Sequence, residues 1–219
     1  MSRSQNPCRS TIVLKVVMAL TGVVLFGFVI GHLLGNLQVY LGAAKLDAYA
    51  KFLKATPALL WGTRLVLLAS VAVHFIAAFI LVQRNHAARP IGYAYQDHRE
   101  ATYASRTMKW SGPIILLFVI YHLLHFTIGT AHPKFDVEKV YANVVIGFSD
   151  WRVSAFYIVA MLALGLHLFH GLWSMFQSLG LNAPKYDACI RRFSCAMTSF
   201  IVLGNISIPV AVLAGWVKI

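Results

Sequence analysis

The stretch that decides the fold is IVLKVVMALTGVVLFGFVIGHLL, residues 12–34. An apolar run must reach about 20 residues to cross the hydrocarbon core of a bilayer as an α-helix, and this run does so with Lys15 as its only charged residue. It is longer than the apolar region of a signal peptide, about 7–15 residues, and contains no Ala-x-Ala cleavage site. We therefore expect a retained transmembrane helix.

Four further apolar stretches have the length of a membrane span. The composition agrees, since 59% of residues are hydrophobic, 12% are charged and the mean hydropathy is +0.70. These features predict an all-α integral membrane protein, a single transmembrane domain over residues 1–219 built as a five-helix bundle. The polar stretches between the spans are expected to be loops, each too short for a soluble domain. The predicted helices cover about 12–41, 58–83, 107–131, 152–180 and 193–217, and the predicted loops are 42–57, 83–109, 131–152 and 180–194.

The formal net charge of +12 indicates a membrane surface and acidic partners, not nucleic acid, because the chain has no separate basic domain. Lysine and arginine are more frequent in the amino-terminal segment and the 83–109 and 180–194 loops than in the segments on the opposite side. The positive-inside rule therefore predicts a cytoplasmic amino terminus and a carboxyl terminus outside.

Histidines are the unusual residues of the predicted spans. A charged side chain in hydrocarbon costs about 2.5 kcal/mol or more, so an intramembrane histidine is normally neutral and partnered. One such residue could simply bridge two helices by a hydrogen bond, but at least one on each of four successive helices indicates metal binding. The histidines within spans are His32, His74, His122, His125, His167 and His170. Three others, His86, His98 and His132, fall in predicted loops and are expected at the surface.

The depths of these histidines predict two levels. With a rise of about 1.5 Å per residue, His32 and His122 lie roughly 20–25 Å from the cytoplasmic ends of their helices, whereas His74 and His167 lie roughly 15–25 Å deep. Two imidazoles facing each other at one depth suit a six-coordinate heme iron, so two levels predict two b hemes between the first four helices. Spacing alone leaves the ligands open, since two further histidines lie one helical turn away on the same faces.

Small residues one turn from these histidines would make room for a flat macrocycle. They are Gly35, Gly171, Ser70, Ala77 and Ala78. For the first helix there is an alternative, because Gly27, Gly31 and Gly35 have the G-x-x-x-G spacing that packs two membrane helices together.

Four strings carry a resemblance to a known family: GHLLGN (31–36), VHFIAA (73–78), IYHLLHF (120–126) and LHLFHGLWS (166–174). They resemble the four histidine-bearing helices of the cytochrome b558 anchor subunit of succinate dehydrogenases and fumarate reductases, over nearly the whole chain. The resemblance implies two heme b groups. His32 and His122 would be the ligands of the distal heme, and His74 and His167 those of the proximal heme. His125 and His170 would then lie near the hemes without binding iron.

The resemblance also implies a function and partners. A flavoprotein subunit with FAD would oxidise succinate, an iron–sulfur subunit would relay electrons, and this chain would pass them to a quinone, expected to be menaquinone, in the bacterial cytoplasmic membrane. A higher oligomer of the complex stays open. Some fumarate reductases of the family carry a glutamate two residues before the ligand of the fourth helix; Gly165 at this position favours succinate oxidation.

Polar residues at the helix ends are candidates for the remaining contacts. Gln38 is the candidate for quinone binding, and the other polar residues at that end are Asn36, Tyr40, Tyr49, Lys51, Asp150 and Arg152. Heme propionates usually pair with basic or hydroxyl groups, and the candidates are Arg64, Arg152, Tyr157, Arg84 and Lys109. The alternative is ordinary flanking of membrane helices by basic residues.

Two other functions use similar residues. A cytochrome b anchor of a hydrogenase or formate dehydrogenase would share the heme chemistry but serve a different soluble enzyme. A heme-free transporter could instead use intramembrane histidines to move protons.

Overall fold

The computed structural model describes residues 10–88, 91 and 101–219, and these residues form helices and turns without a strand. Five helices are long and apolar enough to cross a membrane, which confirms the predicted all-α membrane fold. They are α1 (Thr11–Asn36), α3 (Pro57–Ala88), α4 (Tyr103–Leu123), α6 (Trp151–Ser178) and α7 (Pro184–Leu213). A 3-10 turn, η2 (Leu37–Leu41), extends α1, and a π-helical turn, η3 (Leu124–Ile128), extends α4.

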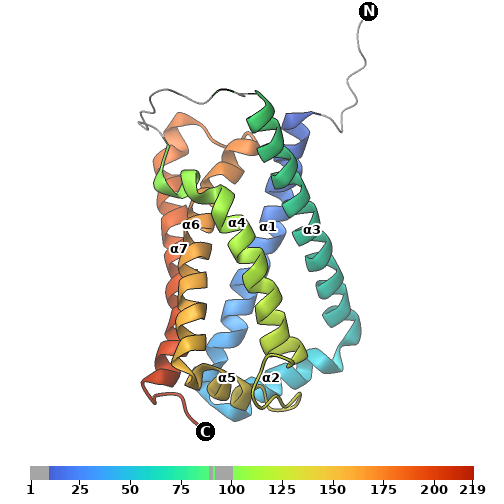
Figure 1. Cartoon of the computed structure of the whole chain (residues 1–219), viewed down its shortest axis with the longest axis vertical. Coiled ribbons are helices and arrows are strands. Elements are labelled where there is room, and N and C mark those ends of the chain that lie inside the picture. The colour runs from blue at the N-terminus through green and yellow to red at the C-terminus, as the bar shows by residue number, and fades with distance from the viewer. Residues whose placement is uncertain (1–9, 89–90, 92–100) are drawn as a thin grey trace, which may run out of the picture.

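The five spans alternate in direction along the bundle (Figure 1). We call one end the amino end, because α1 begins there beside the turn between α6 and α7. The carboxyl terminus lies at the opposite, carboxyl end, together with two short helices, α2 (Ala43–Ala55) and α5 (Val140–Ser149).

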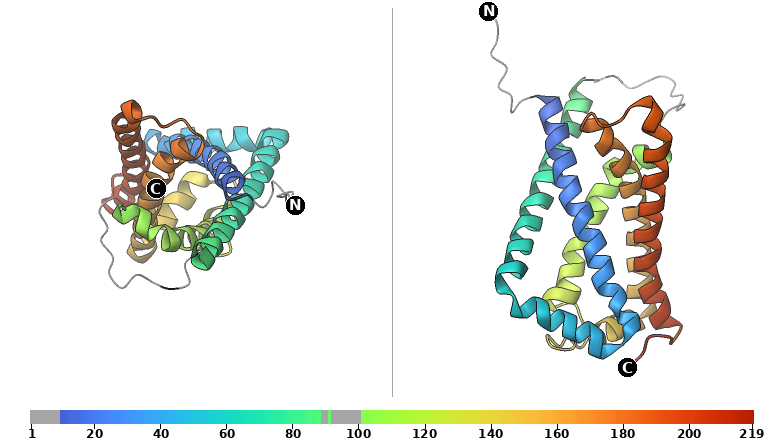
Figure 2. Two further views of the ribbon diagram at one scale, coloured as in Figure 1. Left: turned by 90° about the horizontal axis from the view of Figure 1, so that it is seen from above. Right: turned by 180° about the vertical axis from the view of Figure 1, so that it is seen from behind.

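Helix packing is uneven around the bundle. Helix α6 packs against α7, α4 and α1, whereas α3 packs mainly against α1 and stands at the edge (Figure 2). The main apolar core lies toward the carboxyl end, where α5 packs against η3, α6 and α7. Its buried members include Phe118, Val144, Phe148, Tyr157, Met161, Ile208 and Val212.

The two short helices correct the expectation that stretches 42–57 and 131–152 are loops. Helix α2 is rich in alanine, lysine and leucine, which favour helix, and it buries Leu46. Helix α5 is an apolar segment that buries Val144, Val145 and Phe148. Both are too short to span the membrane, so they close the carboxyl end.

Helix α7 begins earlier than the predicted start at residue 193. Pro184 occupies its first turn, where the missing N–H and the fixed φ of proline favour helix initiation. In this turn Asp187 accepts from Arg191 one turn later at 2.7 Å and from Trp173 of α6 at 3.0 Å. Residues 184–192, whose polar side chains suggested a loop, therefore form the start of α7.

Candidate functional site

Four helices bring the intramembrane histidines together as two pairs. His32 of α1 and His122 of α4 have ring centroids 5.7 Å apart, and we call them the carboxyl-end pair. His74 of α3 and His167 of α6, the amino-end pair, have centroids 6.3 Å apart. Metal-bound imidazole nitrogens lie about 2 Å from the metal, so imidazoles on opposite sides of one ion have centroids roughly 6 Å apart. Both pairs have this spacing.

Hydroxyl groups from neighbouring helices hold the amino-end pair. The Thr21 hydroxyl of α1 lies 3.0 Å from Nδ1 of His74 and donates its own proton to the carbonyl of Val17 at 2.9 Å. It therefore accepts the Nδ1 proton of His74, which leaves Nε2 unprotonated. Metal-binding histidines are characteristically held through their other ring nitrogen in this way.

Ser111 of α4 plays the corresponding part for the other ring of the amino-end pair. Its Oγ lies 3.3 Å from Nδ1 of His167 and donates to the carbonyl of Met108 at 3.4 Å. By the same reasoning Nε2 of His167 is the free nitrogen. Each ring of this pair is thus oriented by a hydroxyl from a helix other than its own.

Aromatic rings surround the carboxyl-end pair. Phe28 stacks on His32 with centroids 5.3 Å apart, and Phe118 lies 5.9 Å from His122. Tyr157 of α6 reaches between two histidines of α4 and η3: its hydroxyl is 3.5 Å from Nδ1 of His122 and 3.0 Å from Nδ1 of His125. The sequence suggested Tyr157 as a propionate partner, and the structure shows its hydroxyl beside His122 and His125.

The surroundings of the pairs leave room for a flat ligand. His32 is exposed and His74, His122 and His167 are half-buried, although all four lie in membrane-spanning helices. A Cβ added at Gly31, next to His32, or at Gly171, one turn after His167, would meet no atom within 4 Å. Paired imidazoles at both levels, free Nε2 atoms on His74 and His167, and the unfilled positions at Gly31 and Gly171 together fit a bis-histidine heme at each level.

The glycines of α1 behave differently from both expectations. A Cβ at Gly35 would lie 2.8 Å from the Tyr49 ring of α2, so this glycine makes room for a tyrosine and not for a macrocycle. Gly27 and Gly31 have no atom within 4 Å of such a Cβ, so among the residues that the structure describes no helix packs on them as the G-x-x-x-G alternative requires.

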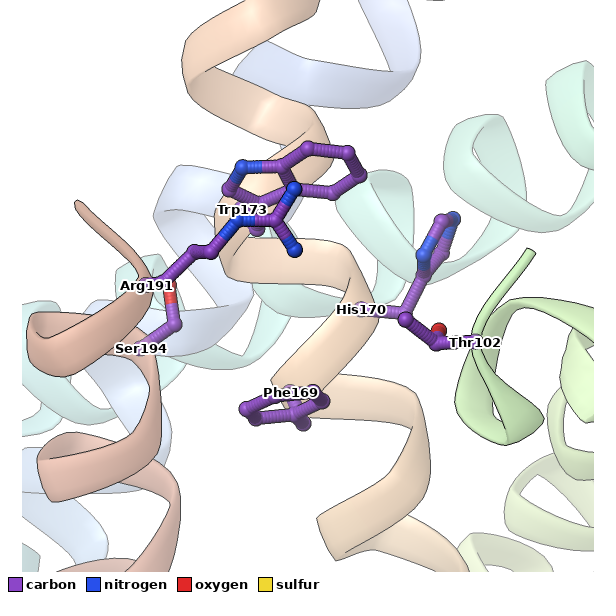
Figure 3. Close-up of a pocket in the computed structure, with 6 residues that line it drawn as sticks. All are labelled: Thr102, Phe169, His170, Trp173, Arg191 and Ser194. Carbon is purple, nitrogen blue, oxygen red and sulfur yellow. The ribbon is translucent and has the colours of Figure 1, made fainter. Parts of the chain in front are cut away.

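His125 and His170 face other surroundings than the pairs. His125 is fully buried in η3. His170 lines a small cavity of about 10 Å³ with Thr102, Phe169, Trp173, Arg191 and Ser194. Figure 3 shows Arg191 against the Trp173 ring, 4.2 Å from its centroid, while His170 lies on the side of α6 that faces Thr102.

The three histidines expected at the surface have different outcomes. His86 is exposed in the last turn of α3, and His98 lies outside the described residues. The expectation for His132 is wrong, because this side chain is only 8% exposed. Its Nε2 lies 2.9 Å from the carbonyl of Asn143 and its Nδ1 accepts the backbone N–H of Lys134 at 3.1 Å. A backbone carbonyl of α5 and a backbone N–H of the loop therefore pair with the two ring nitrogens.

The polar candidates at the helix ends are mostly engaged in local contacts. Arg64 lies over Trp61 at 4.9 Å and Arg152 over Trp151 at 5.9 Å, and both arginines are exposed. Lys109 likewise lies over the ring of Trp110, and Arg84 contacts Thr11.

At the carboxyl end, Asn36 donates to the carbonyl of His32, Tyr40 donates to Ser207, and Asp150 caps the start of α6. Lys51 is exposed on α2. Within the described residues, the side chain of Gln38 makes no hydrogen bond, and the residue is half-buried.

Gly165 of α6 lies in the packing between α6 and α7. It is buried, and a Cβ added there would lie 2.9 Å from Cγ2 of Val202. A larger residue at this position would therefore require the Val202 side chain or its surroundings to shift.

Thr21 and Ser111 are the site residues that sequence reasoning missed. A hydroxyl in an apolar span usually bonds to the carbonyl of its own preceding turn, so neither residue stood out. Their role depends on which helices are neighbours, and only the three-dimensional arrangement supplies that.

Comparison with protein families gives one match. Residues 84–205 match the model of the family described as succinate dehydrogenase/fumarate reductase transmembrane subunit. The match covers more than half of the chain, including all of α4 and α6 with His122 and His167. The comparisons with curated proteins and with solved structures gave no match.

Proposed function

Because the chain belongs to the family of succinate dehydrogenase/fumarate reductase transmembrane subunits, we propose that it is the diheme cytochrome b anchor of such a complex. The family and the five apolar helices make it a multi-pass membrane subunit. In the proposed role it takes electrons from an iron–sulfur subunit and delivers them to a quinone. The family membership favours this role over an anchor of a hydrogenase or formate dehydrogenase.

The observation that carries the proposal is the pairing of His32 with His122 and of His74 with His167. Both pairs have the centroid spacing of two ligands on one metal ion. A proton-conducting transporter would not need two such pairs, since one chain of titratable groups would serve.

Heme bound at each level would supply one-electron transfer within the low-dielectric bundle. The protein's own residues would bind the hemes and orient their ligands. His32, His74, His122 and His167 would hold the two hemes, the hydroxyls of Thr21 and Ser111 orient the rings of His74 and His167, and aromatic rings pack around the carboxyl-end pair. Oxidation of succinate to fumarate releases two electrons and two protons, and reduction of a quinone to a quinol consumes the same number of each.

The proposed partners are a flavoprotein subunit with FAD and an iron–sulfur subunit bound at the amino end. This end exposes Lys109, Lys185 and Arg192, which suit an acidic docking surface. We place the amino end in the cytoplasm of a bacterium, with the pair His74 and His167 nearer the iron–sulfur subunit. The quinone is expected to be menaquinone, and Gln38 at the carboxyl end is the candidate for its hydrogen bond.

Heme counting in the purified complex tests the proposal. Wild type should contain two b hemes per chain, with a dithionite-reduced spectrum of bis-histidine heme. Replacing His32, His74, His122 or His167 singly by alanine should each remove one heme. His86→Ala and His170→Ala are the matched controls and should retain both. A wild-type complex without heme, or loss of heme in the controls alone, would overturn the proposal.

The direction of the reaction needs a separate experiment. Gly165 supports succinate oxidation, because it stands where the fumarate-reducing pattern has a glutamate. Succinate oxidation with menaquinone and fumarate reduction with menaquinol should be measured in proteoliposomes with and without an uncoupler. Faster fumarate reduction under both conditions would contradict the assignment.

A further inference from the structure

We propose that Tyr157 and His125 form a hydrogen-bond chain of fixed direction that keeps His122 in the tautomer able to bind metal. His122 Nδ1–H donates to the Tyr157 oxygen, and the Tyr157 hydroxyl donates to Nδ1 of His125. This inference rests on the proposed function, because it concerns how the carboxyl-end pair holds heme. It assigns His125 as the acceptor that draws the tyrosine proton away from a metal ligand.

The direction follows from counting protons at Tyr157. The hydroxyl has one proton and lies near two ring nitrogens. If it donated to His122, the proton of that ring would be on Nε2, and no unprotonated nitrogen of His122 would remain to bind metal. The hydroxyl is 3.0 Å from His125 and 3.5 Å from His122, and the shorter separation is the one suited to an O–H donor.

Among the described residues, the Tyr157 hydroxyl has hydrogen-bond partners only in His125 and His122. His125 is 0% exposed and Tyr157 is 6% exposed, so bulk water does not reach the pair. The Tyr157 ring is held edge-on by Phe118 and Phe148, with centroids 5.1 and 4.9 Å apart. Without His125 the hydroxyl could turn only toward His122.

His132 lies beside His125 at the far end of the hydrogen-bond chain and does not extend it. Its Nδ1 accepts from Lys134, so its proton is on Nε2, which donates to the carbonyl of Asn143. It therefore has no free lone pair for His125, although the two rings are 5.1 Å apart. Nε2 of His125 is buried without a hydrogen-bond partner in the described structure. In the proposed direction this nitrogen carries the proton of the ring, so the hydrogen-bond chain includes the cost of one unpaired buried N–H.

The hydrogen-bond chain should affect the carboxyl-end heme in two measurable ways. An acceptor at Nδ1–H makes the imidazole a more basic ligand, which favours ferric iron and lowers the reduction potential. Loss of the Tyr157 hydroxyl should therefore raise the potential at this level only. Loss of His125 alone should be worse, because the hydroxyl then competes for Nδ1 of His122.

The test uses the full complex and four variants: Tyr157→Phe, His125→Leu, His125→Asn and the double variant Tyr157→Phe/His125→Leu. Heme affinity is followed by heme transfer to excess apomyoglobin, and each potential by redox titration. Tyr141→Phe is the control, since its hydroxyl donates to the carbonyl of Lys218 at the same end, away from the histidines.

We expect Tyr157→Phe to keep two hemes and to raise only the carboxyl-end potential. His125→Leu should bind that heme about 10- to 100-fold more weakly, and His125→Asn should restore binding because its amide oxygen can accept. The double variant should bind heme better than His125→Leu alone, since no hydroxyl remains to be misdirected.

A purely structural role predicts the opposite for the double variant, which would then bind heme no better than His125→Leu. That result, or an unchanged potential in Tyr157→Phe, would overturn the inference while leaving two hemes in wild type and the proposed function intact. Absence of heme from wild type would instead contradict the proposed function.

Discussion

The two histidine pairs look alike in the sequence but lie in differently built halves of the bundle. At the carboxyl end, His122 adjoins the main apolar core, and the phenol of Tyr157 lies between it and the fully buried His125. At the amino end, His74 and His167 are each oriented by a hydroxyl from another helix, outside that core. One pair is positioned mainly by packing and the other mainly by hydrogen bonds. The two halves should therefore respond to different kinds of substitution.

The largest effect should come from filling space at the carboxyl end. A Cβ at Gly147 of α5 would lie 2.9 Å from the Phe126 ring and 3.0 Å from His125, so Gly147→Val should cost about 1–3 kcal/mol or more through overpacking. Gly112→Val in the amino half of α4 is the matched control, because the added Cβ meets no described atom within 4 Å. Denaturant unfolding in detergent and heme counts measure the difference. Equal destabilisation by both variants would break the comparison.

The contrast between the halves also separates what the sequence predicted from what it could not. Length and hydropathy were sufficient for five spans, and alternating helix direction was sufficient to bring His32 near His122 and His74 near His167. Packing partners were not predictable, because they depend on contacts between residues far apart in sequence. Thus Gly35, one turn from a histidine, accommodates Tyr49 and not a macrocycle.

Short helices and buried polar loops escaped prediction for a related reason. Helix α2 contains three lysines in its thirteen residues, so hydropathy alone does not distinguish it from a loop. His132 lies in a turn whose polarity suggested solvent exposure, yet the carbonyl of Asn143 and the N–H of Lys134 satisfy its ring. A buried polar group is compatible with a polar sequence wherever the backbone supplies its partners.

A second, smaller effect should appear at the amino end when the hydroxyl of Thr21 is removed. Thr21→Val keeps the shape but leaves Nδ1–H of His74 without an acceptor, so heme at this level should bind about 10- to 100-fold more weakly. Thr21→Ser should restore binding. Heme transfer to apomyoglobin gives the measurement. If Thr21→Val instead weakened the carboxyl-end heme, the assignment of hydroxyl support to the amino end would be wrong.

Ser111→Ala should give a weaker version of the same result. The Oγ of Ser111 is 3.3 Å from Nδ1 of His167, longer than the 3.0 Å of the Thr21 contact, so we expect less than about a 10-fold loss of heme affinity. The two substitutions act on opposite rings of one pair, and redox titration of both variants shows whether the same heme responds. Separate responses by different hemes would contradict the pairing of His74 with His167.

The smallest effect should come from polar contacts outside the hydrocarbon region. Lys54 of α2 pairs with Glu138 at 3.3 Å and also donates to the carbonyl of Val137, and the glutamate side chain is 66% exposed. Exposed ion pairs contribute about 0–1 kcal/mol, so Glu138→Gln should change the unfolding free energy by less than about 0.5 kcal/mol and leave both heme potentials unchanged. A shifted carboxyl-end potential would show that surface charge, and not the hydrogen bonds of Tyr157 alone, sets the potential at that level. The amino-end potential, farther from this pair, is the internal control.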